Sequence, residues 1–213
     1  MLIFFDDVLV NMKKCFFIIA VFLLIVSIIF SGCTSSTILD PPLPAPSTTP
    51  ATSIAQAAGS SSGFILNIAS LTPGSIIPDE YTCRGSGESP AVSWDGIPTG
   101  TKSLVLILDD PDAPAGTFTH WIVYNIPPTK GGLGQGQPNA KVLGNNAQQG
   151  ETSAGARGYY PVCPPIGTTH RYVFRLYAVD MDITQPTANR DSIDWALNGH
   201  TIAKTEFTTS FKR

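Results

Sequence analysis

The chain has 213 residues, of which 14% are charged, and its formal net charge at pH 7 is −3. With so few charges and no basic cluster, the sequence argues against nucleic acid as a partner. Nineteen glycines and 18 prolines favour a turn-rich β protein over a helical one.

Residues 12–33 have the pattern of an export signal. Two lysines are followed by an apolar run, residues 16–30, and by small residues before Cys33. Phe30-Ser-Gly-Cys33 resembles a lipobox, at which the signal is cut and the cysteine receives lipid. The apolar run is shorter than the ~20 residues that usually span a bilayer, but an uncleaved signal anchor is the alternative. Either way, we expect an exported protein, anchored to the outer face of the cytoplasmic membrane by lipid or by the signal.

The segments on either side of the signal differ from it in composition. Residues 1–11 contain two aspartates where an export signal should be basic, so we expect translation to start at Met12 and this segment to be a gene-start artefact. Residues 34–62 are rich in Ser, Thr, Pro and Ala, and Asp40 is their sole charge. Such a segment cannot form a packed core, so it is predicted to be a stalk that carries residues 63–213 as one domain.

Residues 63–213 are numerous enough for one sizeable core and are predicted to be mainly β. Short apolar or alternating runs, bounded by Gly, Pro, Asn or Asp, predict antiparallel strands. The predicted strands are residues 64–69, 91–94, 104–108, 118–126, 170–180 and 205–212. One helix is predicted at residues 187–198, where apolar side chains share a face and Asn198-Gly199 forms a C-terminal cap.

Three aspartates follow the apolar run at residues 104–108, which is typical of a strand buried on both faces. Asp109, Asp110 and Asp112 lie among prolines that end the strand and stiffen the following turn. A rigid loop at a strand end commonly carries a functional site. Aspartate is also a common turn former, so both interpretations stay open at this point.

Two of the three histidines lie on predicted strands beside proline-rich loops. Strict alternation places His120 on one face with Phe118, Ile122 and Tyr124. His170 opens a later strand and shares its face with aromatic and apolar residues. These positions make both histidines candidates for a binding site. The third histidine, His200, is predicted to be structural.

Short motifs occur in a characteristic order along residues 64–213. They are Asp110-Pro-Asp-Ala-Pro114, His120-Trp121, Pro164-Pro-Ile-Gly167 and His170-Arg-Tyr172, together with Tyr81-Thr-Cys83, Ser89-Pro90, Tyr124-Asn-Ile-Pro127 and Leu176-Tyr-Ala178. The first four resemble the signatures of the phosphatidylethanolamine-binding protein family, and the others are similar to its prokaryotic, Raf-kinase-inhibitor-like branch. The resemblance implies a large antiparallel sheet packed on smaller β structure, with short helices near the C-terminus.

The resemblance also implies a pocket for phosphate, phosphorylated head groups or carboxylates. The ligand-binding residues carried over by motif are Asp110, His120, Pro165, His170 and Tyr172, with Ala113, Pro114 and Phe118 along the walls. Imidazoles and backbone N–H groups would donate to the anion, and the aspartate would fix a histidine tautomer. Two departures from the family pattern are Pro161-Val162 in place of a Gly-Pro pair and Arg84 in place of an aspartate near the pocket mouth.

We therefore predict a membrane-tethered binding protein with no catalytic activity and no cofactor, whose partner is a small anionic ligand. The main alternative is a protein-interaction module that inhibits a surface enzyme. A minor alternative is a metal site of two histidines and one carboxylate, which the lack of a short-range ligand pair disfavours. Trp94 and Trp195 are predicted to lie in the core.

The four cysteines divide according to this organisation. Cys15 lies in the signal and Cys33 is assigned to lipid, which leaves Cys83 and Cys163 outside the cytoplasm, where disulfides form. A bridge between them would close a loop of about 80 residues and hold the pocket mouth rigid. Two free thiols are the alternative, and the even number favours the bridge.

Overall fold

The computed structural model describes residues 63–129, 131–185 and 187–213. The predicted gene-start artefact, export signal, lipid-carrying Cys33 and stalk lie outside the described residues. Within the described ranges, no helix has the length and apolar character needed to cross a bilayer.

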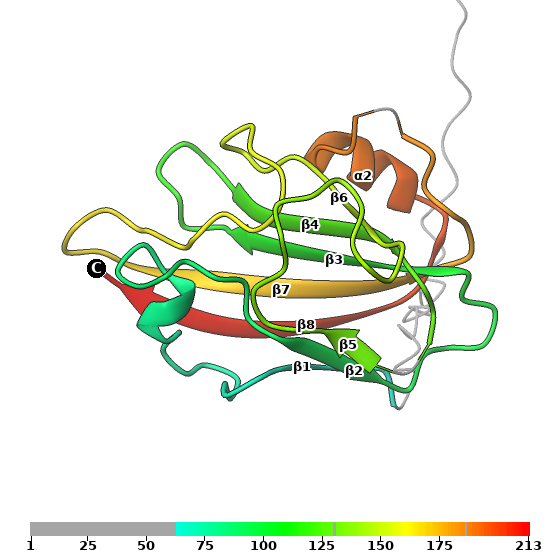
Figure 1. Ribbon diagram of the computed structural model, residues 1–213, viewed down its shortest axis with the longest axis horizontal. Coiled ribbons are helices and arrows are strands. Elements are labelled where there is room, and N and C mark those ends of the chain that lie inside the picture. The colour runs from blue at the N-terminus through cyan, green and yellow to red at the C-terminus, as the bar shows by residue number, and fades with distance from the viewer. Residues whose placement is uncertain (1–62, 130, 186) are drawn as a thin grey trace, which may run out of the picture. The chain divides into compact units, whose positions relative to one another are not determined.

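A five-stranded antiparallel sheet forms the body of the domain (Figure 1). In sheet order its strands are β6 (Gln148–Gln149), β4 (Phe118–Ile126), β3 (Ser103–Asp110), β7 (Thr169–Val179) and β8 (Thr201–Lys212). The four long strands confirm the prediction, and β4 has the predicted bounds. Only β8 begins clearly earlier than expected.

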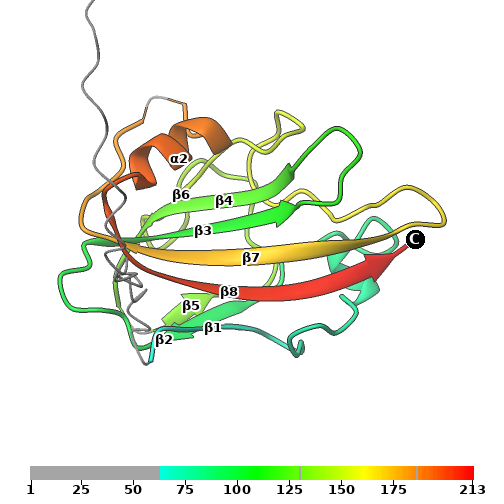
Figure 2. The ribbon, with the colours of Figure 1, turned by 180° about the vertical axis from the view of Figure 1, so that it is seen from behind.

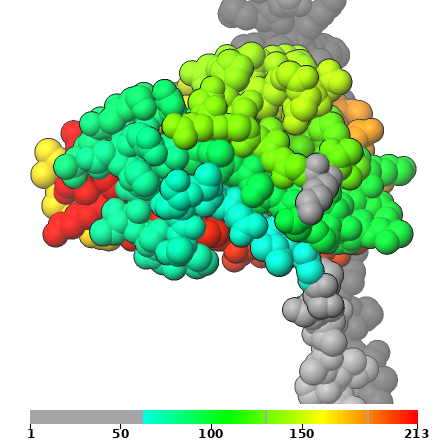
Figure 3. All heavy atoms as spheres, turned by 60° about the horizontal axis from the view of Figure 1, so that its bottom comes forward, coloured from blue at the N-terminus to red at the C-terminus, as the bar shows by residue number. Residues whose placement is uncertain are grey.

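A second antiparallel sheet has three short strands. They are β1 (Ile65–Ile68), β2 (Val92–Asp95) and β5 (Gly131–Leu133), in that order across the sheet, and a 3₁₀ turn, η2 (Asp79–Tyr81), lies between β1 and β2 in the chain. Figure 3 shows the side of the domain that bears this sheet, covered largely by residues of the domain's N-terminal half. A large sheet with smaller β structure packed on it was the expected architecture.

Two hydrophobic clusters lie on opposite faces of the large sheet. The leucines at positions 104, 106 and 108 of β3 pack toward the small sheet, in a cluster that includes Trp94. Val105 and Ile107 pack on the other face, against helix α2 (Arg190–Leu197). All eight residues of β3 are buried, which confirms the prediction of a strand covered on both faces. Figures 1 and 2 show α2 lying over the sheet on the side of β4 and β6.

Helix α2 is shorter than predicted because it has a defined cap at each end. The Asn189 side chain accepts a hydrogen bond from the Ser192 N–H, and the Ser192 hydroxyl accepts one from the Asn189 N–H. Gly199, with φ +80°, follows the C-terminal cap at Asn198, as predicted. The prediction that Trp195 lies in the core is wrong, because the helix buries only one stripe and leaves Trp195 73% exposed.

A β-bulge interrupts the pairing of β3 with β4. Asp109 pairs with Thr119, while the preceding Leu108 pairs with Trp121. His120 is therefore an extra residue on β4 with no counterpart on β3. Bulges of this kind redirect a side chain and occur often beside functional sites.

The bulge corrects the predicted faces of β4. Ile122 and Tyr124 belong to the cluster that packs against α2. The ring of His120 instead lies 5.5 Å from that of Tyr172, which belongs to the cluster on the opposite face. The prediction that His120 shares a face with Ile122 and Tyr124 is wrong, because strict alternation does not continue through an inserted residue.

The loops that carry the predicted site residues gather at one end of the large sheet. In Figures 1 and 2 the β3–β4 loop, the loop before β7 and the C-terminal end of β8 lie together at this end. The side chains of the candidate site come mainly from these loops and from the ends of the adjoining strands.

Candidate functional site

A pocket of about 430 Å³ lies among these loops. Seven residues implied by the family resemblance line it, and they are Asp110, Ala113, Pro114, Phe118, His120, Pro165 and His170. The other lining residues are Ala154, Tyr160, Cys163, Pro164 and Arg213. The pocket thus combines apolar walls with two imidazoles, one carboxylate and one guanidinium.

Asp110 and His170 form a buried pair in the pocket. Oδ2 of Asp110 accepts a hydrogen bond from Nδ1 of His170 at 2.8 Å. Oδ1 of Asp110 accepts one from the backbone N–H of Asp112 at 2.9 Å. Both carboxylate oxygens are therefore engaged, and His170 is fixed with a proton on Nδ1. Its Nε2 atom has no hydrogen-bond partner among the described residues and remains available to a ligand.

His120 is fixed in a similar way by the backbone. Its Nδ1 lies 2.9 Å from the carbonyl oxygen of Tyr160, and because a carbonyl only accepts, Nδ1 must carry the proton. Phe118 packs beside the imidazole, with ring centroids 4.7 Å apart. Burial lowers the pKa of His120, which favours the neutral ring near pH 7. Its Nε2 then offers a lone pair.

Tyr172 supports the site from behind and is not among the residues that line the pocket. Its ring is fully buried and meets His120 edge to face. Its side chain belongs to the hydrophobic cluster beneath the pocket, and a ligand-binding role for Tyr172 stays a prediction. Its hydroxyl makes no hydrogen bond of normal geometry with the described residues. Burial, followed by the negative charge of Asp110, raises the pKa of Tyr172.

An ion pair holds the β3–β4 loop onto the start of β7. Asp112 accepts hydrogen bonds from the backbone N–H of Arg171 at 2.8 Å, from its Nε at 2.9 Å and from its Nη2 at 2.7 Å. These bonds lower the pKa of Asp112 to about 2. Since Asp110 and His170 are close neighbours of this pair in the chain, the clamp keeps the two pocket residues in register.

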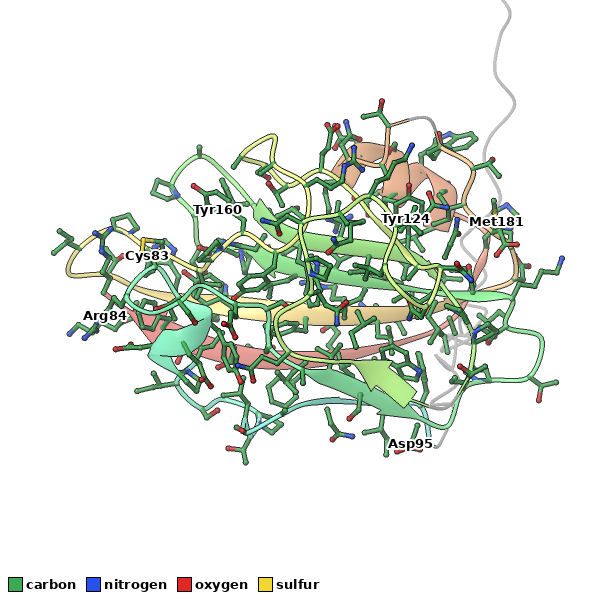
Figure 4. The ribbon with its side chains drawn as sticks, in the orientation of Figure 1. Cys83, Arg84, Asp95, Tyr124, Tyr160 and Met181 are labelled. Atoms are coloured by element: carbon green, nitrogen blue, oxygen red, sulfur yellow. A yellow bond between two sulfur atoms is a disulfide. The ribbon has the colours of Figure 1, made fainter. Side chains whose placement is uncertain are left out.

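A disulfide joins Cys83 to Cys163, with their Cα atoms 5.4 Å apart. The backbone N–H of Cys83 also donates to the carbonyl of Val162 at 3.1 Å. Cys163 lines the pocket, so the bridge fixes this wall to the loop that follows η2. In Figure 4, Cys83 and Tyr160 lie at the same end of the domain.

The positive charge in the pocket wall comes from an unexpected residue. Arg213 lines the pocket, and its Nη1 lies 3.4 Å from Sγ of Cys163. Arg84, expected near the mouth, follows the disulfide-bonded Cys83, pairs with Asp79 at 3.6 Å and lies 6.0 Å from the ring centroid of Phe211. It is not among the residues that line the pocket. Arg213 belongs to no recognisable motif, so its position became visible only in the folded chain.

Asp109 is adjacent to Asp110, but its side chain makes its contacts on the opposite face of the sheet. Its buried carboxylate accepts hydrogen bonds from Thr119 Oγ1 at 2.7 Å and Arg175 Nη1 at 2.8 Å. Arg190 of α2 donates to the same carboxylate at 3.3 Å. This network connects β3, β4, β7 and α2, which indicates a structural role for Asp109.

A second pocket, of about 440 Å³, lies beside α2. It is lined by Thr117, Thr119, Glu151, Thr152, Ser153, Asn189, Arg190, Asp191 and Asp194. Three carboxylates contribute to this lining, and its single arginine is already paired with Asp109 and Asp194. That charge distribution disfavours an anionic ligand, so the pocket with the histidines is the candidate anion site.

A metal site of two histidines and one carboxylate does not suit this geometry. In the part of the chain that the structure describes, no group of three His, Cys, Asp or Glu side chains is placed to hold a metal ion. Both oxygens of Asp110 are occupied by hydrogen bonds to protein, one of them to His170 itself. The carboxylate therefore orients an imidazole and is not free to act as a ligand.

The sequence is similar to curated proteins over most of their length. A "UPF0098 protein" from Methanothermobacter thermautotrophicus is 44% identical over 139 residues, which cover 64% of this chain and 91% of that protein. A "UPF0098 protein" from Aquifex aeolicus is 39% identical over 159 residues, covering 72% of this chain and 92% of that protein.

Solved structures agree with these sequence matches. The phosphatidylethanolamine-binding protein homologue CT736 from Chlamydia trachomatis has a TM-score of 0.65 and 36% identity, over 71% of this chain and 98% of its own. YbcL of E. coli, described as a member of the mammalian family, has a TM-score of 0.65 and 29% identity. The match covers 71% of this chain and 99% of YbcL. Residues 67–212 match the family model described as "Phosphatidylethanolamine-binding protein". The chain therefore belongs to the phosphatidylethanolamine-binding protein family.

Proposed function

We propose that residues 63–213 bind a small oxyanion, such as phosphate, a phosphorylated head group or a carboxylate, between His120 and His170. Membership of the family supports a ligand-binding role. The observation that carries the proposal is the orientation of the two imidazoles. Hydrogen bonds fix both Nδ1 atoms, so both Nε2 atoms remain for a ligand, and each Nε2 donates to an anion when its ring is protonated. The guanidinium of Arg213 adds positive charge to the same wall.

The shape of the pocket suits a small ligand with an apolar portion. Its volume of about 430 Å³ lies within the usual range for small-molecule sites. Ala113, Pro114, Phe118 and Pro165 form apolar walls. These walls exclude water from the imidazoles, which strengthens polar contacts with a bound anion.

Titration followed by NMR tests the proposal. Phosphate, phosphoethanolamine or acetate added to the protein should shift the imidazole signals of His120 and His170. His200 is an internal control, since its exposed ring pairs with Asp180 at 2.9 Å and is not among the pocket residues. His170→Ala should abolish the shifts at His120, and His200→Ala should leave them unchanged. No shift at millimolar ligand would contradict the proposal.

The proposal includes a tether to the outer face of the cytoplasmic membrane. It is supported by the basic, apolar and lipobox-like pattern of residues 12–33. In a host that processes lipoproteins, the chain should incorporate labelled fatty acid and partition with membranes. Cys33→Ala should lose the label. An unlabelled wild-type chain that remains with membranes would support a signal anchor instead.

Inhibition of a surface enzyme is a second candidate function, favoured by apolar side chains near the pocket. Ile166 is 80% exposed within the proline-rich loop, and Tyr160 is 39% exposed. Exposed apolar side chains in a constrained loop are suited to protein contacts. If this function holds, Ile166→Asp should weaken binding of the target enzyme and leave phosphate binding unchanged.

A further inference from the structure

The second pocket, beside α2, combines buried hydroxyl groups with exposed carboxylates. Among its lining residues, Thr119 and Thr152 are buried. Asp191 and Asp194 lie on α2 and are exposed, and Glu151, from the loop between β6 and β7, is partly exposed. The pocket has a volume of about 440 Å³, which is ample for a small molecule.

Hydrogen bonds connect the three parts of the chain that line this pocket. The Glu151 N–H donates to the carbonyl of Ala188 at 2.7 Å, in the segment that leads into α2. The Ser153 N–H donates to the carbonyl of Thr119 at 2.9 Å, and the Ser153 hydroxyl accepts from the Thr119 N–H at 2.9 Å. Figures 1 and 2 show the same loop beside α2. The loop, β4 and α2 therefore present their side chains from one connected framework.

The hydroxyl of Thr152 is the unexplained polar group of this pocket. Thr152 is 6% exposed, and its Oγ1 has no hydrogen-bond partner among the described residues. Its backbone is fully used, since its N–H donates to the Ala156 carbonyl at 2.8 Å and its carbonyl accepts from the Gly155 N–H at 2.9 Å. A buried hydroxyl without a partner is destabilising, and native proteins retain few of them. The side chain is the group of this residue that remains for a ligand.

The carboxylates of this pocket are not fully matched by cations. Arg190 is shared between Asp194 and an aspartate of β3, and Arg157 lies 3.5 Å from Glu151. The carboxylate of Asp191 has no ion-pair partner in the part of the chain that the structure describes. The pocket therefore has an excess of negative charge together with an unpartnered hydroxyl, and both favour a ligand that donates hydrogen bonds and carries positive charge.

The spread of these groups favours an organic cation over a metal ion. Within the described ranges, no group of three acidic, histidine or cysteine side chains is placed to hold a metal. Carboxylates that do not converge on one point can still meet separate ammonium groups of an extended molecule. An ammonium group donates three hydrogen bonds and accepts none, which matches carboxylate and hydroxyl oxygens.

We propose that the pocket beside α2 binds a small organic cation with two or more ammonium groups, of the polyamine class. One ammonium group donates to the hydroxyl of Thr152, and another pairs with Asp191 at the edge of the pocket. This site shares no lining residue with the histidine pocket, so the inference does not depend on the proposed anion binding.

Calorimetric titration of the full chain at low ionic strength tests this inference. Putrescine is the probe, Mg²⁺ is the control of equal charge, and butane-1,4-diol is the control of equal shape without charge. Putrescine should bind at least about tenfold more tightly than either control, and added salt should weaken it. Equal binding of Mg²⁺ would reveal only general attraction of counterions and overturn the proposal. Equal binding of the diol would overturn the cationic class, and no binding of putrescine at millimolar concentration would overturn the site itself.

Three variants assign the binding to this pocket. Thr152→Val keeps the shape of the side chain but removes the hydroxyl, and it should weaken putrescine binding by about tenfold. Without ligand its melting temperature should equal or exceed that of the wild type, because the lost group had no partner. Asp191→Asn should weaken binding by about threefold, since an exposed ion pair contributes less. Asp182→Asn removes an exposed carboxylate outside the pocket and should leave the affinity unchanged. Wild-type affinity in both Thr152→Val and Asp191→Asn would overturn the assignment.

Discussion

Removing the disulfide between Cys83 and Cys163 should lower the free energy of unfolding by about 4.5 kcal/mol. The bridge joins residues 80 positions apart. In the chain-entropy model, opening a loop of that length returns about 15 cal/mol/K to the unfolded chain, or about 4.5 kcal/mol at 25 °C. Serine at these positions adds little cost of its own, because Cys83 is exposed and Cys163 is partly exposed. For a domain of about 150 residues, the melting temperature should fall by about 9–18 °C.

Calorimetry and urea unfolding of the Cys83→Ser/Cys163→Ser variant measure this loss. Ser86→Ala is a matched control in the same loop, because it removes only an exposed hydroxyl bond to the Glu80 carbonyl. The control should change the free energy of unfolding by less than about 0.5 kcal/mol. A melting temperature within about 3 °C of the wild type in the double variant would refute the reasoning. It would mean that residual structure already restricts the unfolded chain or that the bridge strains the native state.

Three further substitutions have distinct expected effects. Because the folded-state pKa of Asp112 is about 2, below its ordinary value near 4, its ion pair with Arg171 stabilises the fold above about pH 4 and is lost as pH falls toward about 2. The stability difference between wild type and Asp112→Asn should therefore shrink over that interval in acid unfolding curves, and a constant difference would contradict the assignment. Phe174→Ala should cost about 3–5 kcal/mol in urea unfolding, since this ring is fully buried in the core, and a loss below about 1 kcal/mol would be inconsistent with that packing. Trp195→Ala should change stability by less than about 0.5 kcal/mol, and a larger loss would mean that the exposed indole is covered in solution.

The sequence predicted the long strands well because their patterns are strong. An uninterrupted apolar run marks β3, alternation marks β7, and prolines or glycines bound both. Strands β5 and β6 escaped prediction because three and two residues are too few to show a period. Trp195 was misplaced because hydrophobicity alone does not report which side of a short helix is covered.

The sequence could predict only those residues of the site that belong to recognisable motifs. Motifs located Asp110, His170 and most of the walls. The bulge at His120 depends on how two strands pair, which neither strand shows alone. The partner of His120 is the backbone carbonyl of Tyr160, and a carbonyl has no signature in a sequence. Arg213 reaches the pocket because the edge strand β8 runs along β7 and ends at Lys212, beside the start of β7.

The two-sided burial of β3 has a consequence for how the chain folds. A slip of one residue would exchange leucines with valine and isoleucine, and would exchange Asp110 with Asp109. Both faces would remain apolar and a carboxylate would still face each side, so hydrophobicity alone penalises the slip only weakly. Polar features then contribute to the correct alignment, namely the bulge at His120, the pairing of Asp112 with Arg171 and the network around Asp109. Chains that lack these features should populate misaligned sheets during refolding, compact and hydrophobic inside yet unable to assemble the pocket.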